Sequence, residues 1–318
     1  MAADGTEVDP RAATGMVVEM HGMLATVLLA GGERVRCRPP RARTTPVIGD
    51  RVTIDRGDDP PRILEIAPRA RTFARPAPAG PSPIATHIDR LVIVTSVFPG
   101  PRPGLVDRMW SALDDASVEV VLVLNKVDLP GADEARAALG DLVAAGARLV
   151  ETSTRSRQGI AGLAALLGHG LSVLAGHSGV GKSSLLNALV PAAGLGIGEV
   201  HGATGKGRHT TTVATVHALG AGLVVDTPGV RAFPLDGLPL DEVARRFPGF
   251  HEPAARCHFA GCLHEGEPGC AVADEAPPER LARWLQLLAA LREEAATPEG
   301  VRAAAARGGK GPPPRRRR

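Results

Sequence analysis

One glycine-rich stretch constrains the fold of this chain more than any other. The eight residues Gly176-His177-Ser178-Gly179-Val180-Gly181-Lys182-Ser183 follow the apolar run 171–175 and precede residues 184–189, which have the composition of a helix. A strand, a glycine-rich loop and a helix in this order form a phosphate-binding P-loop. Glycines let the backbone wrap closely around a polyphosphate, and the start of the helix adds positive potential. The motif predicts a nucleoside triphosphate site in an α/β domain.

The residues of this motif have separate expected roles. Lys182 is expected to hold the β- and γ-phosphates, and the Ser183 hydroxyl to bind Mg²⁺. The whole stretch from Gly176 to Ser184 is predicted to contact the nucleotide. A second acid follows an apolar strand further along, in Asp226-Thr227-Pro228-Gly229. Asp226 is expected to bind the metal through water, and the Gly229 amide to face the γ-phosphate.

The sequence Asn125-Lys126-Val127-Asp128 ends another apolar run and predicts the base. The Asp128 carboxylate can accept hydrogen bonds from guanine N1–H and the 2-amino group, a donor pair that adenine lacks. Asn125 would support the loop and Lys126 would cover the ring. Ser153 and Thr154 can offer backbone amides to guanine O6. These residues predict GTP and argue against an ATP-dependent enzyme, which is the alternative for a P-loop.

The order of these motifs is unusual, because Asn125 precedes Gly176 by 51 residues. An ordinary G domain begins with the P-loop and carries the guanine motif far downstream. The exchanged halves indicate a circular permutation, which is tolerated when the original termini lie close together. The segment after Asp226 then leads directly into the C-terminal part of the chain, which hydrolysis could move.

The stretch Gly205-Lys206-Gly207-Arg208-His209-Thr210-Thr211-Thr212 lies where the first switch of a GTPase is expected. We expect Thr211 to complete the Mg²⁺ shell, with Thr210 and Thr212 as alternatives. Val230 stands where Ras-like enzymes carry a glutamine that orients water. An apolar side chain cannot do this, so intrinsic hydrolysis should be slow. His209 is our hypothesis for the assisting catalytic group.

The rest of the chain divides by composition into parts of different character. Short alternating apolar segments with turn residues between them predict a small antiparallel β-barrel, with an OB-fold as the candidate. Continuous apolar runs alternating with helical patterns then predict a doubly wound sheet. The expected organisation is a tail (1–14), an OB-fold (15–72), a proline-rich linker (73–86), a permuted GTPase domain (87–240), a zinc-binding module with a helix (241–296) and a basic disordered tail (297–318).

Arginine is unevenly distributed along the chain. Residues 33–75 hold eleven Arg and six acidic residues, and the chain ends in Arg315-Arg316-Arg317-Arg318. Clustered positive charge predicts an anionic partner, most commonly nucleic acid, although a solvated basic face is an equal alternative. The barrel lacks aromatic side chains on which bases could stack, so contacts to RNA should be mostly to phosphate.

The four cysteines are best interpreted in a reducing compartment. The N-terminus lacks an apolar signal sequence and no apolar run is long enough to cross a bilayer, so we expect a cytoplasmic protein without membrane contact. Cys257, Cys262, His264 and Cys270 then suit one structural, tetrahedral Zn²⁺. Cys37 stands apart from this cluster and is expected to be a small core residue.

The combination of the basic barrel, NKVD, GHSGVGKSS, GRHTTT, DTPGVR and the Cys-x4-Cys-x-His-x5-Cys cluster closely resembles one family. It is that of the circularly permuted, ribosome-small-subunit-dependent GTPases (RsgA). The resemblance covers about residues 15 to 295; His177 occupies a variable position, and the arginine tail is an addition. It implies a late step in maturation of the 30S subunit, binding to 16S rRNA, and hydrolysis of GTP to GDP that the subunit stimulates. A monomer is expected. The alternative is a nucleotide-gated RNA-binding regulator whose hydrolysis is incidental.

Overall fold

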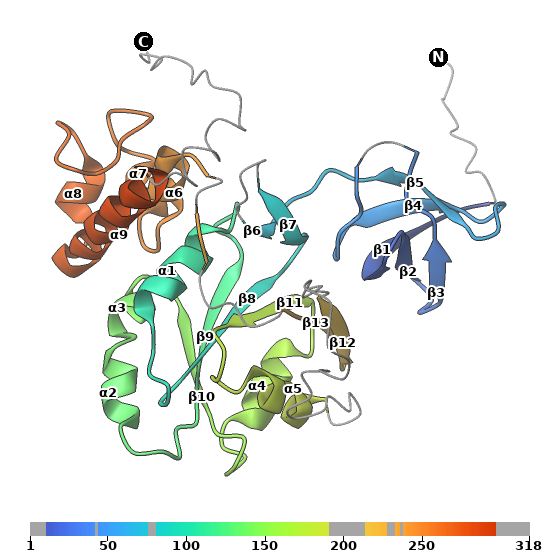
Figure 1. The fold of residues 1–318 in the computed structure, drawn as a ribbon, viewed down its shortest axis with the longest axis horizontal. Helices are drawn as coiled ribbons and strands as arrows, with labels where there is room; N and C mark the ends of the chain where they lie inside the picture. Colours follow the sequence, from blue (N-terminus) through green and yellow to red (C-terminus); the bar gives the residue numbers. More distant parts are fainter. Residues whose placement is uncertain are drawn as a thin grey trace, which may run out of the picture.

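A computed structural model describes residues 11–41, 44–75, 81–190, 214–227, 233–235 and 238–296. It has an N-terminal β-sheet and a C-terminal helical module on either side of a central α/β domain (Figure 1). Several residues singled out in the sequence lie outside the described ranges, namely His209, Thr210, Thr211, Thr212, Gly229, Val230 and the terminal arginines 315–318.

The N-terminal part is a five-stranded antiparallel sheet with the order β3-β2-β1-β4-β5. Its strands are β1 (Ala12–His21), β2 (Leu24–Leu29), β3 (Arg34–Cys37), β4 (Arg51–Asp55) and β5 (Arg62–Ile66). A parallel bridge between Arg38 and Arg62 joins the two outer strands, so the sheet curls back on itself. Its core includes Cys37, which is fully buried as predicted. The expected tail needs one correction, because β1 begins at Ala12 and residues 12–14 pair with β4. The OB-fold itself stays a prediction.

The segment expected to be a linker is partly structured. Its ends, β6 (Phe73–Arg75) and β7 (Ser82–Ala85), pair as a two-stranded antiparallel sheet. Phe73 is buried and stacks on Phe233, with ring centroids 5.5 Å apart. At the barrel side, Gly49 packs so closely on the chain after β7 that a Cβ there would lie 1.9 Å from the Thr86 carbonyl oxygen. The linker expectation was therefore wrong for these residues, because their apolar side chains and backbone dock on both neighbouring parts.

The central domain is built on a six-stranded sheet with the order β10-β9-β8-β11-β13-β12. Its strands are β8 (Arg90–Ser96), β9 (Glu119–Asn125), β10 (Arg148–Thr152), β11 (Leu171–Gly176), β12 (Thr215–Leu219) and β13 (Gly222–Asp226). All pairs are parallel except the edge pair of β12 with β13. The strand order reverses between β8 and β11. In such sheets ligands bind beyond the carboxyl ends of the strands at this reversal.

Helices cover both faces of this sheet, as predicted for a doubly wound domain. They are α1 (Pro103–Ser111), α2 (Ala132–Ala137), α3 (Gly140–Ala144), α4 (Ile160–Leu167) and α5 (Lys182–Leu189). Leu91 and Ile93 of β8 belong to the core shared with α1, α2 and α3, while Val92 and Val94 belong to the core shared with α4 and α5. This alternation is the mark of strands buried on both sides.

The C-terminal module contains α6 (Leu240–Arg246), α7 (His251–Ala254), α8 (Ala271–Glu275) and the long α9 (Pro278–Ala296). Its helix α9 is joined to the central domain by ion pairs. Arg280, only 2% exposed, lies 3.0 Å from both Asp107 of α1 and Asp141 of α3. The same guanidinium donates to the Pro248 carbonyl and lies over the ring of Phe247. Removing one partner of such a buried pair leaves an uncompensated charge, so the packing of the module on the central domain should be sensitive to substitution of Arg280.

Among the described residues, none of the helices combines the length and the apolar character that crossing a bilayer requires.

Candidate functional site

The P-loop runs from the end of β11 to the start of α5, at the strand-order reversal of the sheet. Its backbone needs glycine at defined places. A Cβ at Gly176 would lie 2.5 Å from the Val94 carbonyl oxygen, and Gly179 and Gly181 have φ values of +86° and +94°. Gly181 is the N-cap residue of α5, and Lys182 is its first residue. Unpaired N–H groups of a helix start therefore face the loop, which is the arrangement that binds phosphate.

The guanine motif at the end of β9 contacts the P-loop directly, although the two are far apart in sequence. Asn125 Nδ2 donates to the Val180 carbonyl at 2.9 Å, and Thr152 Oγ1 donates to Asn125 Oδ1 at 3.2 Å. Lys126 Nζ donates to the carbonyls of Phe98 and Gly179, both at 2.7 Å. Asp128 remains exposed beside them. The structure thus brings together the base-recognition and phosphate-binding residues that the sequence predicted.

The loop after β10 agrees only in part with its expected role. Ser153 is buried, and its backbone amide donates to the Gln158 carbonyl at 3.0 Å. Its Oγ accepts a hydrogen bond from the Ser156 amide, also at 3.0 Å. These bonds close the loop on itself, so the Ser153 amide is already engaged. The Thr154 amide stays the candidate donor to guanine O6.

Lys182 and Asp226 face each other at the carboxyl ends of β11 and β13. Their Nζ and Oδ1 atoms are 4.0 Å apart, and burial both lowers the pKa of Lys182 and raises the pKa of Asp226. Asp226 Oδ1 is buried and accepts no hydrogen bond from the described part of the chain. Ser183 is exposed one residue further along α5. A carboxylate and a hydroxyl oxygen are ligands that suit Mg²⁺, so these residues fit that ion.

The four predicted zinc ligands form one compact cluster. Their ligand atoms all lie within 4.8 Å of one another. His264 Nδ1 is 3.7 Å from Cys257 Sγ and 3.3 Å from Cys270 Sγ, close to the roughly 3.4–3.8 Å between ligands of a tetrahedral zinc ion. Burial raises the pKa of Cys262 and of Cys270, which disfavours bare thiolates without a metal. The donor set and its spacing fit Zn²⁺.

Sequence reasoning missed several residues that complete the site. Thr152 orients Asn125, and the Phe98 carbonyl helps to hold Lys126. Thr152 directly precedes the predicted Ser153, which was the available signal. The Phe98 contact is made by a backbone atom, so its residue type carried no signal.

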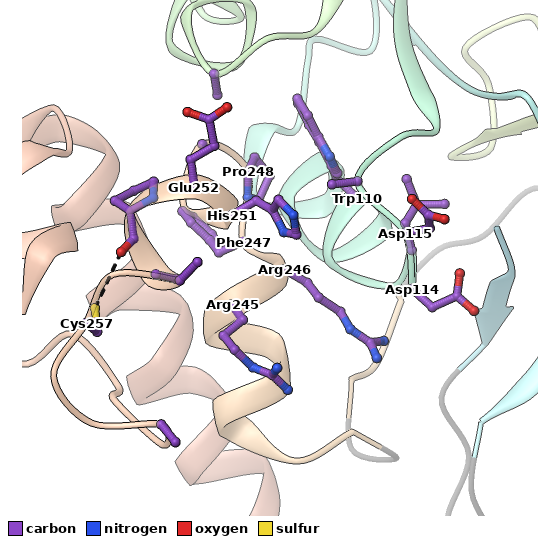
Figure 2. Close-up of a pocket in the computed structure, with 18 of the residues that line it drawn as sticks. Trp110, Asp114, Asp115, Arg245, Arg246, Phe247, Pro248, His251, Glu252 and Cys257 are labelled. Carbon is purple, nitrogen blue, oxygen red and sulfur yellow. Dashed lines mark hydrogen bonds between the residues drawn. The ribbon is translucent and has the colours of Figure 1, made fainter. Parts of the chain in front are cut away.

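A separate cleft of about 770 Å³ lies between the central domain and the C-terminal module. Figure 2 shows Arg245 and Arg246 on one wall and Asp114, Asp115 and Trp110 on the other. None of the predicted nucleotide-site residues that the structure describes lines this cleft, so it is distinct from the P-loop site.

Comparison with known proteins agrees with these observations. A family model described as RsgA GTPase matches residues 66–236, more than half of the chain. The chain belongs to the RsgA GTPase family. It is therefore a GTPase, and its relatives in this family include proteins named small ribosomal subunit biogenesis GTPase RsgA. The relative from Azotobacter vinelandii is 36% identical over 91% of this chain and 89% of its own length. The relative from Bordetella pertussis is 37% identical over 87% of this chain and 95% of its own length.

Solved structures of RsgA-like proteins show the same fold. YjeQ from Thermotoga maritima aligns with a TM-score of 0.68 and 27% identity, covering 88% of this chain and 99% of that protein. YloQ, described as a circularly permuted GTPase, aligns with a TM-score of 0.66 and 25% identity. The alignment covers 92% of this chain and 99% of YloQ. The permuted motif order inferred from the sequence is confirmed.

Gly181 offers a direct test of the contact between the two RsgA motifs. A Cβ at this residue would lie 2.6 Å from Asn125 Nδ2, and its φ of +94° is unfavourable for alanine. Gly181→Ala should lower the free energy of unfolding by about 1–3 kcal/mol. It should also weaken GDP binding, because Asn125 must move away from Val180. Equilibrium denaturation and titration with a fluorescent GDP measure the two effects.

Gly162→Ala is the matched control for this variant. Gly162 lies within α4, where a Cβ meets nothing within 4 Å. Alanine there should leave GDP affinity unchanged and stabilise the helix by up to about 1 kcal/mol. Equal GDP affinity in the Gly181→Ala and Gly162→Ala variants would contradict the predicted role of Gly181.

Proposed function

We propose that this GTPase acts in biogenesis of the small ribosomal subunit, with hydrolysis stimulated by the 30S subunit. The observation that carries this proposal is the similarity to small ribosomal subunit biogenesis GTPases over about nine tenths of the chain. The contact of Lys126 and Asn125 with the P-loop supports guanine nucleotide binding at the carboxyl ends of β9 and β11. GTP and GDP are thus the proposed ligands.

Different residues of this chain bind the base, the phosphates and the metal ion. Asp128 accepts hydrogen bonds from the guanine edge, Asn125 holds the loop, and the stem of Lys126 covers the base. The amides between Gly176 and Ser184, with Lys182, hold the phosphates. Ser183 and Asp226 would hold Mg²⁺, which neutralises charge that develops on the transferred phosphoryl group. Thr211 and the Gly229 amide are proposed to complete this site.

The catalytic step needs a group that orients the attacking water. Val230 cannot do so, because its side chain has no hydrogen-bonding atom. His209 is the proposed group in this chain, and ribosomal RNA is the alternative supplier. Either way the intrinsic rate should be low, and a partner that completes the site should raise it.

The parts that flank the GTPase domain are proposed to contact 16S rRNA. The N-terminal barrel, which we propose to be an OB-fold, carries exposed arginines such as Arg34, Arg36 and Arg51. Phosphate contacts by such residues bind RNA without reading its sequence. The module built on Cys257, Cys262, His264 and Cys270 is proposed to hold one structural Zn²⁺ and to present a second contact surface. We propose that the protein acts as a monomer in the cytoplasm.

The decisive test is steady-state GTP hydrolysis by the purified protein with and without 30S subunits, with 50S subunits as the control. We expect a rise of at least about tenfold with 30S subunits alone, within the range that partner-supplied groups give other GTPases. No 30S-specific rise, with GTP still bound tightly, would overturn the ribosome-dependent role. It would favour an RNA-binding regulator, whose ligand could be sought with unrelated RNAs.

A further inference from the structure

His177, the second residue of the P-loop, is buried, whereas its neighbours Ser178 and Gly179 are exposed. Its Nδ1 lies 2.9 Å from the Ser178 carbonyl oxygen. Because a carbonyl can only accept, Nδ1 carries the proton and donates it to the loop's own backbone. The imidazole therefore holds the loop from inside the domain instead of reaching out of the P-loop.

The other side of this ring faces α1. His177 lines a void of about 10 Å³ together with Thr95 of β8 and the α1 residues Leu105, Val106 and Met109. This is about the space that one water molecule needs. His177 Nε2 and Thr95 Oγ1 are both buried without a hydrogen-bond partner among the described residues. The ring thus lies between the loop, β8 and α1.

We propose that His177 is a positioning residue that wedges the P-loop against α1, so that the geometry of the phosphate-binding amides depends on where α1 lies. The loop backbone between Gly176 and Gly181 has few side chains of its own that could fix it. The imidazole and the Val180 side chain are the large buried groups in this part of the loop, and the imidazole is also bonded to the backbone at Ser178.

Helix α1 is also joined to the C-terminal module, through residues next to those that face His177. Asp107 follows Val106 and is 1% exposed, and its Oδ1 lies 3.0 Å from the Arg280 guanidinium of α9. Arg108 is bonded to Glu294 near the end of α9 at 2.5 and 3.1 Å. A rigid helix that packs against the P-loop on one face and against α9 on another is a physical route for coupling between two sites. The position of the module should therefore influence how tightly the P-loop holds the nucleotide.

This inference rests on nucleotide binding at the P-loop and adds a regulation of that site by the C-terminal module. By reciprocity, nucleotide binding would also favour one docked position of the module. Nothing in the coupling requires the ribosome, so purified full-length protein suffices for the test.

Two variants distinguish the contribution of the His177 ring, which packs against α1, from the contribution of its hydrogen bond. His177→Phe keeps a ring against α1 and removes the donor, and His177→Asn keeps a donor near the place of Nδ1 and removes the bulk. The dissociation constant for a fluorescent GDP, together with KM and kcat for GTP, is measured for each. We expect about a tenfold weaker GDP affinity for His177→Asn and a smaller change for His177→Phe. His177→Asn should also melt at a lower temperature, because it leaves a cavity where the buried ring stood. Equal affinities for wild type and His177→Asn would overturn the proposal.

The route through α1 is tested with Arg280→Lys, which keeps the charge but cannot bond Asp107, Asp141 and Pro248 together. In the wild-type background we expect GDP affinity to fall about fivefold, at the lower end of typical coupling between sites. In the His177→Asn background we expect no further loss. Independent, multiplying effects of the two substitutions would overturn the route, and so would unchanged affinity in Arg280→Lys.

Arg292→Lys is the matched control on the same helix. Arg292 pairs with Glu265 inside the module at 2.6 Å and is exposed, so its substitution should leave GDP affinity unchanged. A loss equal to that of Arg280→Lys would show a general effect of the module and overturn the specific route. If the wild-type protein failed to bind the fluorescent GDP, the guanine-nucleotide site itself would be wrong, which is a different failure.

Discussion

An Asp128→Asn variant is expected to bind GTP roughly 10²- to 10⁴-fold more weakly than the wild-type protein. The carboxylate would accept two hydrogen bonds from guanine, and each bond to a charged group contributes about 1.5–3 kcal/mol. Asparagine offers one acceptor and one donor group, so its NH₂ group would face the guanine donors. Because Asp128 is exposed and Asn125 carries the contact with Val180, the fold should be unaffected.

Xanthosine triphosphate provides the complementary measurement. Its 2-oxo group can accept from the asparagine NH₂, so this nucleotide should be hydrolysed by the variant in place of GTP. Competition between the two nucleotides in a steady-state assay gives the preference directly. Asp133→Asn is a suitable control, because Asp133 is an exposed acid a few residues away and should leave the GTP preference unchanged. A variant that preferred ATP would refute the assignment of Asp128 to guanine.

Removal of the proposed zinc ligand Cys262 is expected to have the largest effect on stability. The structure fits one zinc ion per chain, and structural zinc sites in small peptides contribute about 10–16 kcal/mol of apparent binding free energy. Cys262→Ser should therefore purify with far less than one equivalent of zinc, and the segment 257–270 should lose its structure. A strong chelator should likewise remove zinc from the wild-type protein and unfold the segment 257–270. Metal content by elemental analysis measures the first effect.

Fluorescence can follow the loss of structure in segment 257–270, because the chain has only two tryptophans. Trp284 is buried, and its Nε1 donates to the Leu263 carbonyl at 2.6 Å, next to His264. In a Trp110→Phe background, loss of zinc should shift the Trp284 emission to longer wavelength as water reaches the ring. Cys37→Ala removes a thiol in the barrel and should keep both zinc and emission. A Cys262→Ser protein with full zinc and unchanged emission would refute the ligand set.

The features that could be predicted from the sequence are those set by residues close together in the chain. The P-loop, the guanine motif and the zinc ligands are short motifs whose residue types are dictated by local chemistry, and the structure brings each set together as expected. The strands β8, β9 and β11 of the central sheet were predictable because continuous apolar runs leave little choice but burial on both faces.

Contacts between distant residues were not predictable from the same reasoning. Asp107 and Arg280 are 173 residues apart, and neither forms part of a motif. The prolines of segment 73–86 suggested a spacer, but the partner that buries Phe73 is Phe233, far along the chain. Tertiary packing decided both cases.

The exchanged order of the motifs also affects how the domain is made. A ribosome synthesises β8, β9 and β10 first, so the guanine motif is complete before any residue of the P-loop exists. The strand β11 must then pair with β8, and Val180 can meet Asn125 only after about three fifths of the residues have been joined. Domains generally fold as units during synthesis, the N-terminal domain first. A nascent chain of this protein therefore passes through a stage in which the guanine motif has been synthesised but the P-loop that it contacts has not.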